Sequence, residues 1–128
     1  MRVLLVDNHQ LVRQVLARVL AAEPDLEVVG QVATGQEAIE LTRRLEPEAV
    51  LITVRLTGLS GVETTRAILA EFPWVCVIGM TLVENDAEAQ AVRDAGATAC
   101  ISKSGPLEAL LGAIRACPRK PKIINAGK

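Results

Sequence analysis

The feature that most constrains the fold is a repeated alternation of short apolar runs with longer amphipathic segments. The runs are rich in β-branched residues and cover Val3–Val6, Glu27–Val32, Ala49–Thr53, Val75–Met80 and Ala99–Ser102. Runs such as VLLV and AVLIT are continuously apolar, which is typical of strands covered on both faces of a parallel sheet. The segments between them repeat apolar residues at helical spacing. The pattern predicts a (βα)5 chain, an α/β fold with a parallel five-stranded sheet and right-handed crossovers.

Helix start and stop signals support this alternation. Three pairs have the spacing of a capping box or something close to it: Thr34 with Glu37, Ser60 with Glu63, and Asn85 with Glu88. Three prolines fall where an expected helix should stop before the next strand: Pro24, Pro47 and Pro73. We expect Ser104 to precede the last helix and Pro106 to lie in its first turn. The widest apolar stripe comprises Leu11, Val12, Val15, Leu16, Val19 and Leu20.

Length and composition indicate one domain with a substantial aliphatic core. The chain has 128 residues, of which 50% are hydrophobic, and its aromatic residues are Phe72 and Trp74. A net charge of −1 argues against the folded body binding DNA or an acidic membrane unaided. The first apolar run is too short for a signal peptide, and no stretch approaches the roughly 20 apolar residues of a membrane span. We therefore expect a cytoplasmic protein without membrane contact.

Three cysteines are present, at Cys76, Cys100 and Cys117. Their number is odd, they are widely spaced, and no CxxC pair occurs. This favours separate, small buried thiols in a reducing cytoplasm, with no metal site.

The end of the chain departs from the alternating pattern. Pro118 and Pro121 interrupt any continuing helix, and the surrounding CPRKPKIINAGK is basic. We therefore expect a domain over residues 1–117, followed at 118–128 by a linker or tail that could lead to an output domain.

Polar side chains gather at the ends of the expected strands. In a parallel sheet the carboxyl ends share one edge, where open α/β proteins usually place their sites. Four runs deliver polar residues to that edge: Asp7, Asn8 and His9 after the first, Thr53 at the third, Thr81 at the fourth and Lys103 after the fifth.

The order of these motifs resembles the receiver domain of two-component response regulators, in particular the NarL/LuxR-type branch. The segments that carry the resemblance are VLLVDNHQLVRQVL, EVVGQVATGQEAIEL, RLTGLSG and DAGATACISKS. They span nearly the whole chain. The resemblance implies a doubly wound, flavodoxin-like receiver fold with strand order 2-1-3-4-5.

In receivers, an acidic pair binds Mg²⁺, and an aspartate ending strand 3 accepts a phosphoryl group from a histidine kinase. A Ser or Thr ending strand 4 and a Lys after strand 5 then bond the phosphoryl oxygens. The resemblance assigns the first acid to Asp7, the hydroxyl to Thr81 and the lysine to Lys103. Whether Thr81 and Lys103 keep a binding role or act only as structural polar groups stays open.

Other positions depart from the family pattern. The second acid is Asn8, the phosphoacceptor position is Thr53, with Arg55 in the loop that follows, and the aromatic switch position falls at Cys100. A threonine hydroxyl is a poor nucleophile without an adjacent base. Mg²⁺ needs carboxylate ligands, and Asp7 can instead be balanced by Lys103. We therefore expect a degenerate phosphorylation site with no catalytic residue, no enzymatic activity, and Mg²⁺ binding lost or weak.

These departures favour a phosphorylation-independent interaction module of a LuxR-type transcription regulator. We expect protein partners on the face of helix 4, strand 5 and helix 5. Homodimerisation stays open, and DNA would be contacted only through an output domain. The alternative is a receiver switched by unconventional phosphorylation, including phosphorylation of Thr53 by a Ser/Thr kinase, or by a small molecule in the cleft. A flavodoxin-like binding or catalytic domain ranks last, because NHQLVRQ replaces a Gly-rich phosphate loop.

Overall fold

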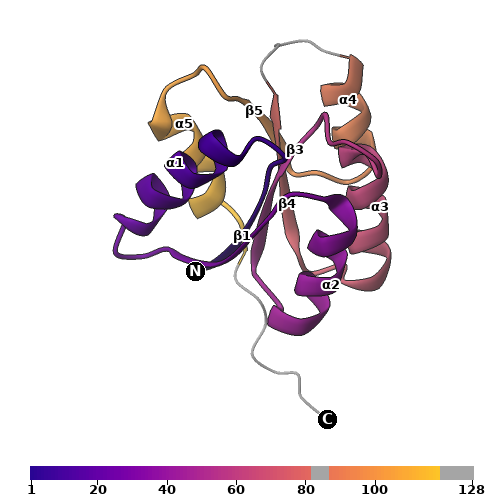
Figure 1. The fold of residues 1–128 in the computed structure, drawn as a ribbon, viewed down its shortest axis with the longest axis horizontal. Coiled ribbons are helices and arrows are strands. Elements are labelled where there is room, and N and C mark those ends of the chain that lie inside the picture. Colours follow the sequence, from indigo (N-terminus) through magenta and orange to yellow (C-terminus); the bar gives the residue numbers. More distant parts are fainter. Residues whose placement is uncertain (82–86, 119–128) are drawn as a thin grey trace.

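The computed structural model describes residues 1–81 and 87–118, which form a three-layer α/β domain (Figure 1). Strands and helices alternate along the chain in the order β1 Arg2–Val6, α1 Gln10–Ala21, β2 Glu27–Val32, α2 Gly35–Leu45, β3 Ala49–Thr53, α3 Gly61–Glu71, β4 Cys76–Thr81, α4 Ala87–Asp94, β5 Ala99–Ser102 and α5 Leu107–Arg115. The strands are parallel and follow the order β2-β1-β3-β4-β5. The predicted fold class and strand order are confirmed.

The continuously apolar strands divide their side chains between two cores. Val3 and Leu5 of β1 pack in one core, and Leu4 and Val6 pack in the other, because successive side chains of a strand point to opposite faces. Helices α1 and α5 cover the first face, and α2, α3 and α4 cover the second (Figure 1). Burial on both faces explains why no polar alternation marks these strands.

Two of the three predicted helix caps lie in the described residues and are confirmed. Thr34 Oγ1 accepts from the backbone N–H of Glu37, and Ser60 forms a reciprocal capping box with Glu63. The third predicted pair begins at Asn85, which lies outside the described residues.

The start of the last helix differs from the prediction. Pro106 is the N-cap of α5 rather than a first-turn residue, and its backbone is extended. Ser104 precedes α5 as expected, and its hydroxyl pairs with that of Ser102 at 2.9 Å. Proline has no backbone N–H that needs a partner here, but it also offers no side chain to cap the first turn of α5.

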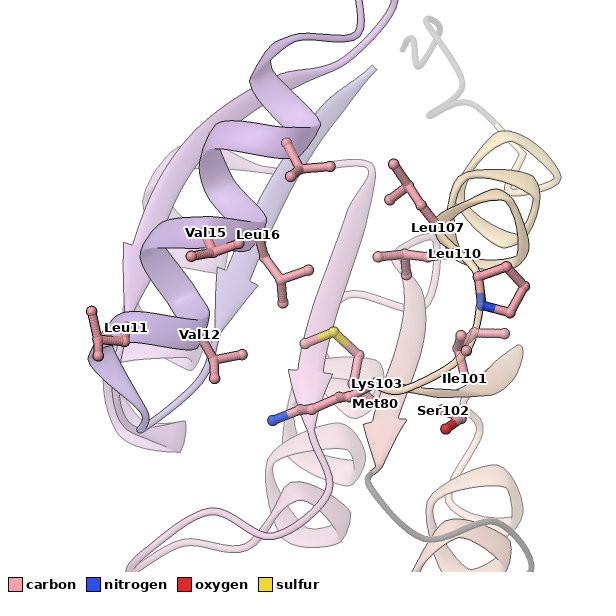
Figure 2. A pocket seen from close by; sticks show the side chains of 13 residues that line it. Leu11, Val12, Val15, Leu16, Met80, Ile101, Ser102, Lys103, Leu107 and Leu110 are labelled. Atoms are coloured by element: carbon pink, nitrogen blue, oxygen red, sulfur yellow. The ribbon is translucent and has the colours of Figure 1, made fainter.

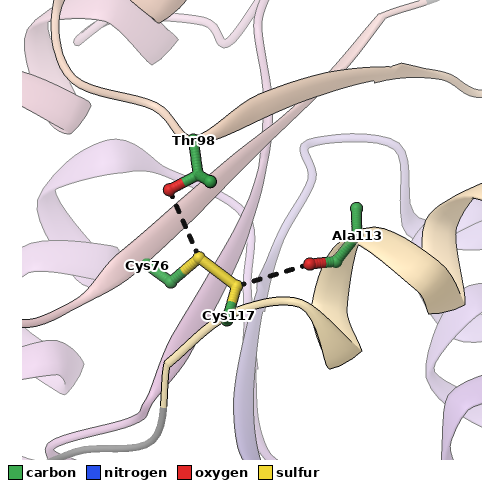
Figure 3. Close-up of a disulfide and its surroundings, with 4 residues drawn as sticks. All are labelled: Cys76, Thr98, Ala113 and Cys117. Carbon is green, nitrogen blue, oxygen red and sulfur yellow. Dashed lines mark hydrogen bonds between the residues drawn. A yellow bond between two sulfur atoms is a disulfide. The ribbon is translucent and has the colours of Figure 1, made fainter.

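The interpretation of all three cysteines as separate thiols is wrong. Cys76 and Cys117 form a disulfide (Figure 3), and Cys100 lies outside it. Cys76 opens β4 and Cys117 lies just beyond α5, 41 positions later in the sequence. Spacing along the chain could not predict this pair, because it depends on where α5 ends over the sheet.

Two further expectations concern membrane-spanning helices and the segment that follows the domain. Within the described residues, no helix is long and apolar enough to cross a membrane. Of the expected linker at 118–128, only Pro118 belongs to the described residues.

Candidate functional site

The carboxyl ends of four strands bring the predicted polar residues to one edge of the sheet. Asp7 directly follows β1, Thr53 ends β3, Thr81 ends β4 and Lys103 directly follows β5. The ladder continues past the strands, because the backbone N–H of Lys103 donates to the carbonyl of Thr81 at 2.6 Å. The edge predicted from the sequence is therefore a single assembled site.

The centre of the site is a buried ion pair. Lys103 Nζ donates to Asp7 Oδ2 at 2.9 Å, and the two side chains are 8% and 0% exposed. Their opposite charges were expected to balance, and the geometry agrees. A charge buried this deeply needs a close partner, because desolvation of an unpaired ion is expensive.

The backbone around Asp7 fixes the orientation of its carboxylate. The backbone N–H of His9 donates to Asp7 Oδ1 at 2.9 Å, while Arg13 Nη1 donates to the Asp7 carbonyl at 2.6 Å. His9 is the N-cap of α1, and its ring is largely exposed, with Nδ1 3.6 Å from Asp7 Oδ1. Sequence reasoning missed Arg13, because no motif distinguishes an arginine that turns back toward a strand end.

Thr53 occupies the position next to the ion pair in the sheet. It is 5% exposed, and within the described residues its hydroxyl has no hydrogen-bond partner. Behind it α3 begins at Gly61, where an added Cβ would lie 2.8 Å from the Thr53 carbonyl and 2.6 Å from that of Val54. Only glycine permits this close approach of the helix start to the strand end. Thr53 is thus held in a tight backbone setting with a hydroxyl that no described base contacts.

Two polar contacts connect the loops around the site. Asn8 Nδ2 donates to Thr57 Oγ1 at 3.1 Å, which joins the loop after β1 to the loop after β3. Arg55 forms an ion pair of 2.6 Å with Glu88, which joins the same β3 loop to α4. The predicted residues Asn8 and Arg55 therefore hold the rim of the site together.

Cys100 lies beside the central strands rather than at the ion pair. Its position on β5 pairs with Gly79 on β4, where an added Cβ would lie 3.3 Å from Cys100 Sγ and 3.0 Å from Val92 of α4. The side chain packs in the core beneath α4, on the opposite face from Cys76. A thiol here fills the space beneath the helix without offering a ring that could rotate.

An apolar groove lies between α1 and α5 and reaches the strand-end site at Lys103 (Figure 2). Its volume is about 510 Å³, with Leu11, Val12 and Val15 on one wall and Leu107 on the other. Leu11 and Val15 are 77% and 60% exposed. The apolar stripe predicted for the first helix therefore extends beyond the core. Hydrophobic spacing identifies a helix face but not whether another element covers it.

A parallel α/β sheet in the order 2-1-3-4-5, with a buried acid–lysine pair at its carboxyl edge, defines a receiver-type signalling domain. The sequence model for the response regulator receiver domain matches residues 3–115. The chain belongs to the response regulator receiver domain family. Domains of this family are generally signalling domains rather than enzymes.

Similar proteins place the chain near LuxR-type regulators. The response regulator GacA of Pseudomonas viridiflava is 39% identical over 114 residues, covering 89% of this chain and 53% of the relative. Transcriptional regulatory protein LiaR of Bacillus subtilis is 35% identical, covering 99% of this chain and 62% of the relative. A LuxR-family two-component response regulator from Aurantimonas sp. SI85-9A1 superposes with a TM-score of 0.85 at 32% identity, covering 90% of this chain and 82% of that one.

The chain spans 53% of GacA and 62% of LiaR, so the match covers little more than half of these relatives. What the whole relatives do therefore does not transfer to this chain with the fold.

Proposed function

We propose that this domain is a pseudo-receiver, a receiver module that acts through protein contacts without phosphoryl transfer. The proposal rests on the contacts of the Thr53 hydroxyl and of the Asp7 carboxylate. Thr53 presents a buried hydroxyl that contacts no described base, and Asp7 is already paired with Lys103. A hydroxyl needs an adjacent base to become a nucleophile. Here the neighbouring carboxylate is neutralised by the lysine.

The residues at the site do not fit a Mg²⁺ ion. Mg²⁺ is held by carboxylates, carbonyls and waters in near-octahedral geometry. The five strand-end side chains of Asp7, Asn8, Thr53, Thr81 and Lys103 supply one carboxylate, and a lysine ammonium occupies one of its oxygens at 2.9 Å. The amide of Asn8 is directed to Thr57 instead. We therefore propose that the domain binds no specific Mg²⁺ and requires no cofactor.

The similarity to a transcriptional regulatory protein supports a role in transcription regulation. LiaR is 35% identical to the chain, and the structural neighbour from Aurantimonas belongs to the LuxR family. We propose that the domain is cytoplasmic, works within a longer LuxR-type regulator and is not an enzyme. Its partners would dock on the face of α4, β5 and α5. DNA contact would belong to an output domain beyond the linker.

The decisive experiment is phosphoryl labelling of the 128-residue chain with acetyl phosphate and Mg²⁺, read by intact mass. The unmodified chain should gain no phosphoryl group. Thr53→Asp alone should label poorly, because Asn8 still replaces the second acid. Asn8→Asp with Thr53→Asp should label better, and hydroxylamine should remove the label if it is an acyl phosphate.

The same experiment separates two ways in which the unmodified chain could still be phosphorylated. A hydroxylamine-sensitive label on the unmodified chain would contradict the proposal and indicate an unconventional acceptor. A hydroxylamine-resistant label that peptide mapping places on Thr53 would show phosphorylation of the hydroxyl itself, which also contradicts it.

A further inference from the structure

The disulfide joins the start of β4 to the segment that follows α5. Cys76 is the first residue of β4, and Cys117 lies two residues past the end of α5 (Figure 3). The two residues are 3% and 5% exposed. Because β4 runs from Cys76 to Thr81, the disulfide lies at the opposite edge of the sheet from the Asp7–Lys103 pair. It is therefore a second site, separate from the strand-end cluster.

The neighbours of the disulfide would accommodate both oxidation states. The hydroxyl of Thr98 lies 3.4 Å from Cys76 Sγ, and the carbonyl of Ala113 lies 3.5 Å from Cys117 Sγ (Figure 3). In the dithiol state the Cys117 thiol can donate to that carbonyl. The Cys76 thiol and the Thr98 hydroxyl can form a hydrogen bond in which either group donates. Neither sulfur would be left in a purely apolar setting after reduction.

The disulfide is the strong attachment of the end of α5. Among the described residues, Arg115 also forms ion pairs there with Glu23 and Asp25, and all three side chains are partly exposed. Exposed ion pairs contribute little and are screened by salt. The apolar residues Leu110, Leu111 and Ile114 also hold the helix to the core. Breaking the disulfide would thus leave α5 attached through its buried side chains and a screened ion-pair cluster.

We propose that Cys76 and Cys117 form a reversible redox modification site that controls how firmly α5 is held to the sheet. Disulfides in a reducing compartment are usually transient and redox-sensing. The assignment of this disulfide as a redox-sensing site rests on the proposed cytoplasmic signalling function. The exchange chemistry itself does not depend on it.

The oxidant is a low-molecular-weight disulfide. The thiolate of Cys117 attacks one sulfur of the small disulfide, forms a mixed disulfide and releases one small thiol. The thiolate of Cys76 then attacks the Cys117 sulfur, closes the protein disulfide and releases the second small thiol. Two protein thiols are oxidised, one small disulfide is reduced to two thiols, and the two protons transfer to the released thiolates.

Position in the chain explains how buried sulfurs take part. Cys117 follows the last turn of α5 and precedes the exposed Pro118. Helix ends open locally at low cost, so Cys117 becomes accessible without unfolding of the sheet. Cys76 lies in the same core, whereas Cys100 packs on the opposite face of the sheet. Cys100 is therefore not placed to exchange with either partner.

The effect of oxidation reaches the apolar groove between α1 and α5. Leu107 and Leu110 of α5 line the groove (Figure 2), and Cys117 lies two residues past the end of the same helix. The oxidised state fixes this wall against the sheet. In the reduced state this covalent constraint is lost, and α5 stays on the sheet through its buried side chains.

The test uses the 128-residue chain equilibrated with glutathione and glutathione disulfide at a series of ratios. Samples are quenched with acid, unfolded, alkylated with N-ethylmaleimide and measured by intact mass and peptide mapping. The reduced chain, with its three cysteines, should carry three adducts, and the oxidised chain should carry one, on Cys100. The two forms should interconvert in both directions as the ratio changes.

Hydrogen exchange measured on both forms tests the structural consequence. Amides of residues 107–117 should exchange on the order of tenfold faster after reduction, and those of α3 should not change. Cys117→Ser should show the fast pattern at every ratio. Because the unmodified chain supplies both states, the comparison stands even if that variant fails to fold.

Three results would overturn the proposal. These are three adducts at every ratio, one adduct even in excess glutathione, and equal exchange of residues 107–117 in both forms. Phosphoryl labelling is a separate mass change, so failure of this proposal is distinguishable from failure of the proposed function.

Discussion

The ammonium of Lys103 lies 2.9 Å from Oδ2 of Asp7 and closes a buried ion pair between residues that follow β5 and β1. The two strands occupy different positions in the sheet, with β3 and β4 between them. The pair therefore spans the carboxyl edge in front of Thr53 and Thr81. A lysine in this place supplies the positive charge that Asp7 requires.

Removal of Lys103 should destabilise the domain strongly. Lys103→Ala leaves the carboxylate of Asp7, which is 0% exposed, without its partner. Breaking a buried pair in this way typically costs about 3–5 kcal/mol. Urea unfolding at neutral pH measures the loss. The exposed Arg66→Ala is the matched control, with an expected change within about 0.5 kcal/mol.

A double variant separates pairing from packing. Asp7→Asn with Lys103→Met removes both charges and should recover much of the stability lost in Lys103→Ala, because no unpaired ion remains. Equal stability of Lys103→Ala and the unmodified chain would show that the pair does not hold the site.

Replacement of Thr53 by valine should stabilise the domain. The Thr53 hydroxyl is buried and makes no hydrogen bond to the described residues. An isosteric methyl removes a desolvated polar group, so we expect a gain of about 1 kcal/mol in the free energy of unfolding. Thr42→Val is the matched control, because the buried Thr42 hydroxyl donates to the Ala38 carbonyl at 2.7 Å. A loss in Thr53→Val as large as that in Thr42→Val would indicate that Thr53 is hydrogen-bonded.

The strand-end site could be predicted because sheet geometry leaves little choice. Continuous apolar runs indicated parallel strands buried on both faces, and parallel strands bring their carboxyl ends to one edge. Asp7, Thr53 and Lys103 follow from that rule without knowledge of any helix position. The pairing of Asp7 with Lys103 followed from charge, because a buried aspartate and a buried lysine at one edge compensate each other.

The disulfide and the groove could not be predicted in the same way. Each depends on where a helix lies over the sheet, and periodicity does not fix that placement. The end of α5 lies over the start of β4, which brings Cys117 to Cys76. The stripe of α1 is wider than the surface that α5 covers, which leaves Leu11 and Val15 exposed.

Magnesium should not bind specifically at the carboxyl edge. Asp7 is the single carboxylate among the five strand-end side chains, and Lys103 competes for it electrostatically. Backbone NMR shifts of residues 7, 8 and 53 during titration with Mg²⁺ should stay unchanged. The double variant Asn8→Asp with Thr53→Asp is the positive control and should shift. Saturable shifts of the unmodified chain at sub-millimolar Mg²⁺ would contradict the expectation.

The acid stability of the domain should depend on Asp25. Arg115 donates to both oxygens of Asp25 at 2.8 and 2.9 Å, and these hydrogen bonds lower the pKa of Asp25 from 3.8 to about 2. A carboxyl with a depressed folded pKa contributes stability that is fully present above the unfolded value and is lost as the pH falls through the folded value. The contribution should therefore disappear between about pH 4 and pH 2.

Melting temperatures across this pH range measure the dependence. Asp25→Asn should show a shallower fall than the unmodified chain, and the exposed Glu27→Gln should not. Because the ion pair is exposed, the difference should be small and should shrink at high salt. Identical pH profiles for Asp25→Asn and the unmodified chain at low salt would show that the Arg115 contact does not form in solution.

The oxidised domain should occupy one dominant conformation across α4 and β5. A conformational equilibrium shifts only when an event favours one state over the other. Under the proposed function no phosphoryl group draws Thr81 toward Thr53, and Cys100 offers no ring to move with it. Relaxation-dispersion NMR of residues 87–94 and 99–102 should therefore give flat profiles in the oxidised chain. The positive control is Asn8→Asp with Thr53→Asp in the presence of beryllofluoride and Mg²⁺, where shifts across the same residues are expected. Dispersion across α4 and β5 in the unmodified, oxidised chain would reveal a second populated state and would contradict the expectation of a single conformation.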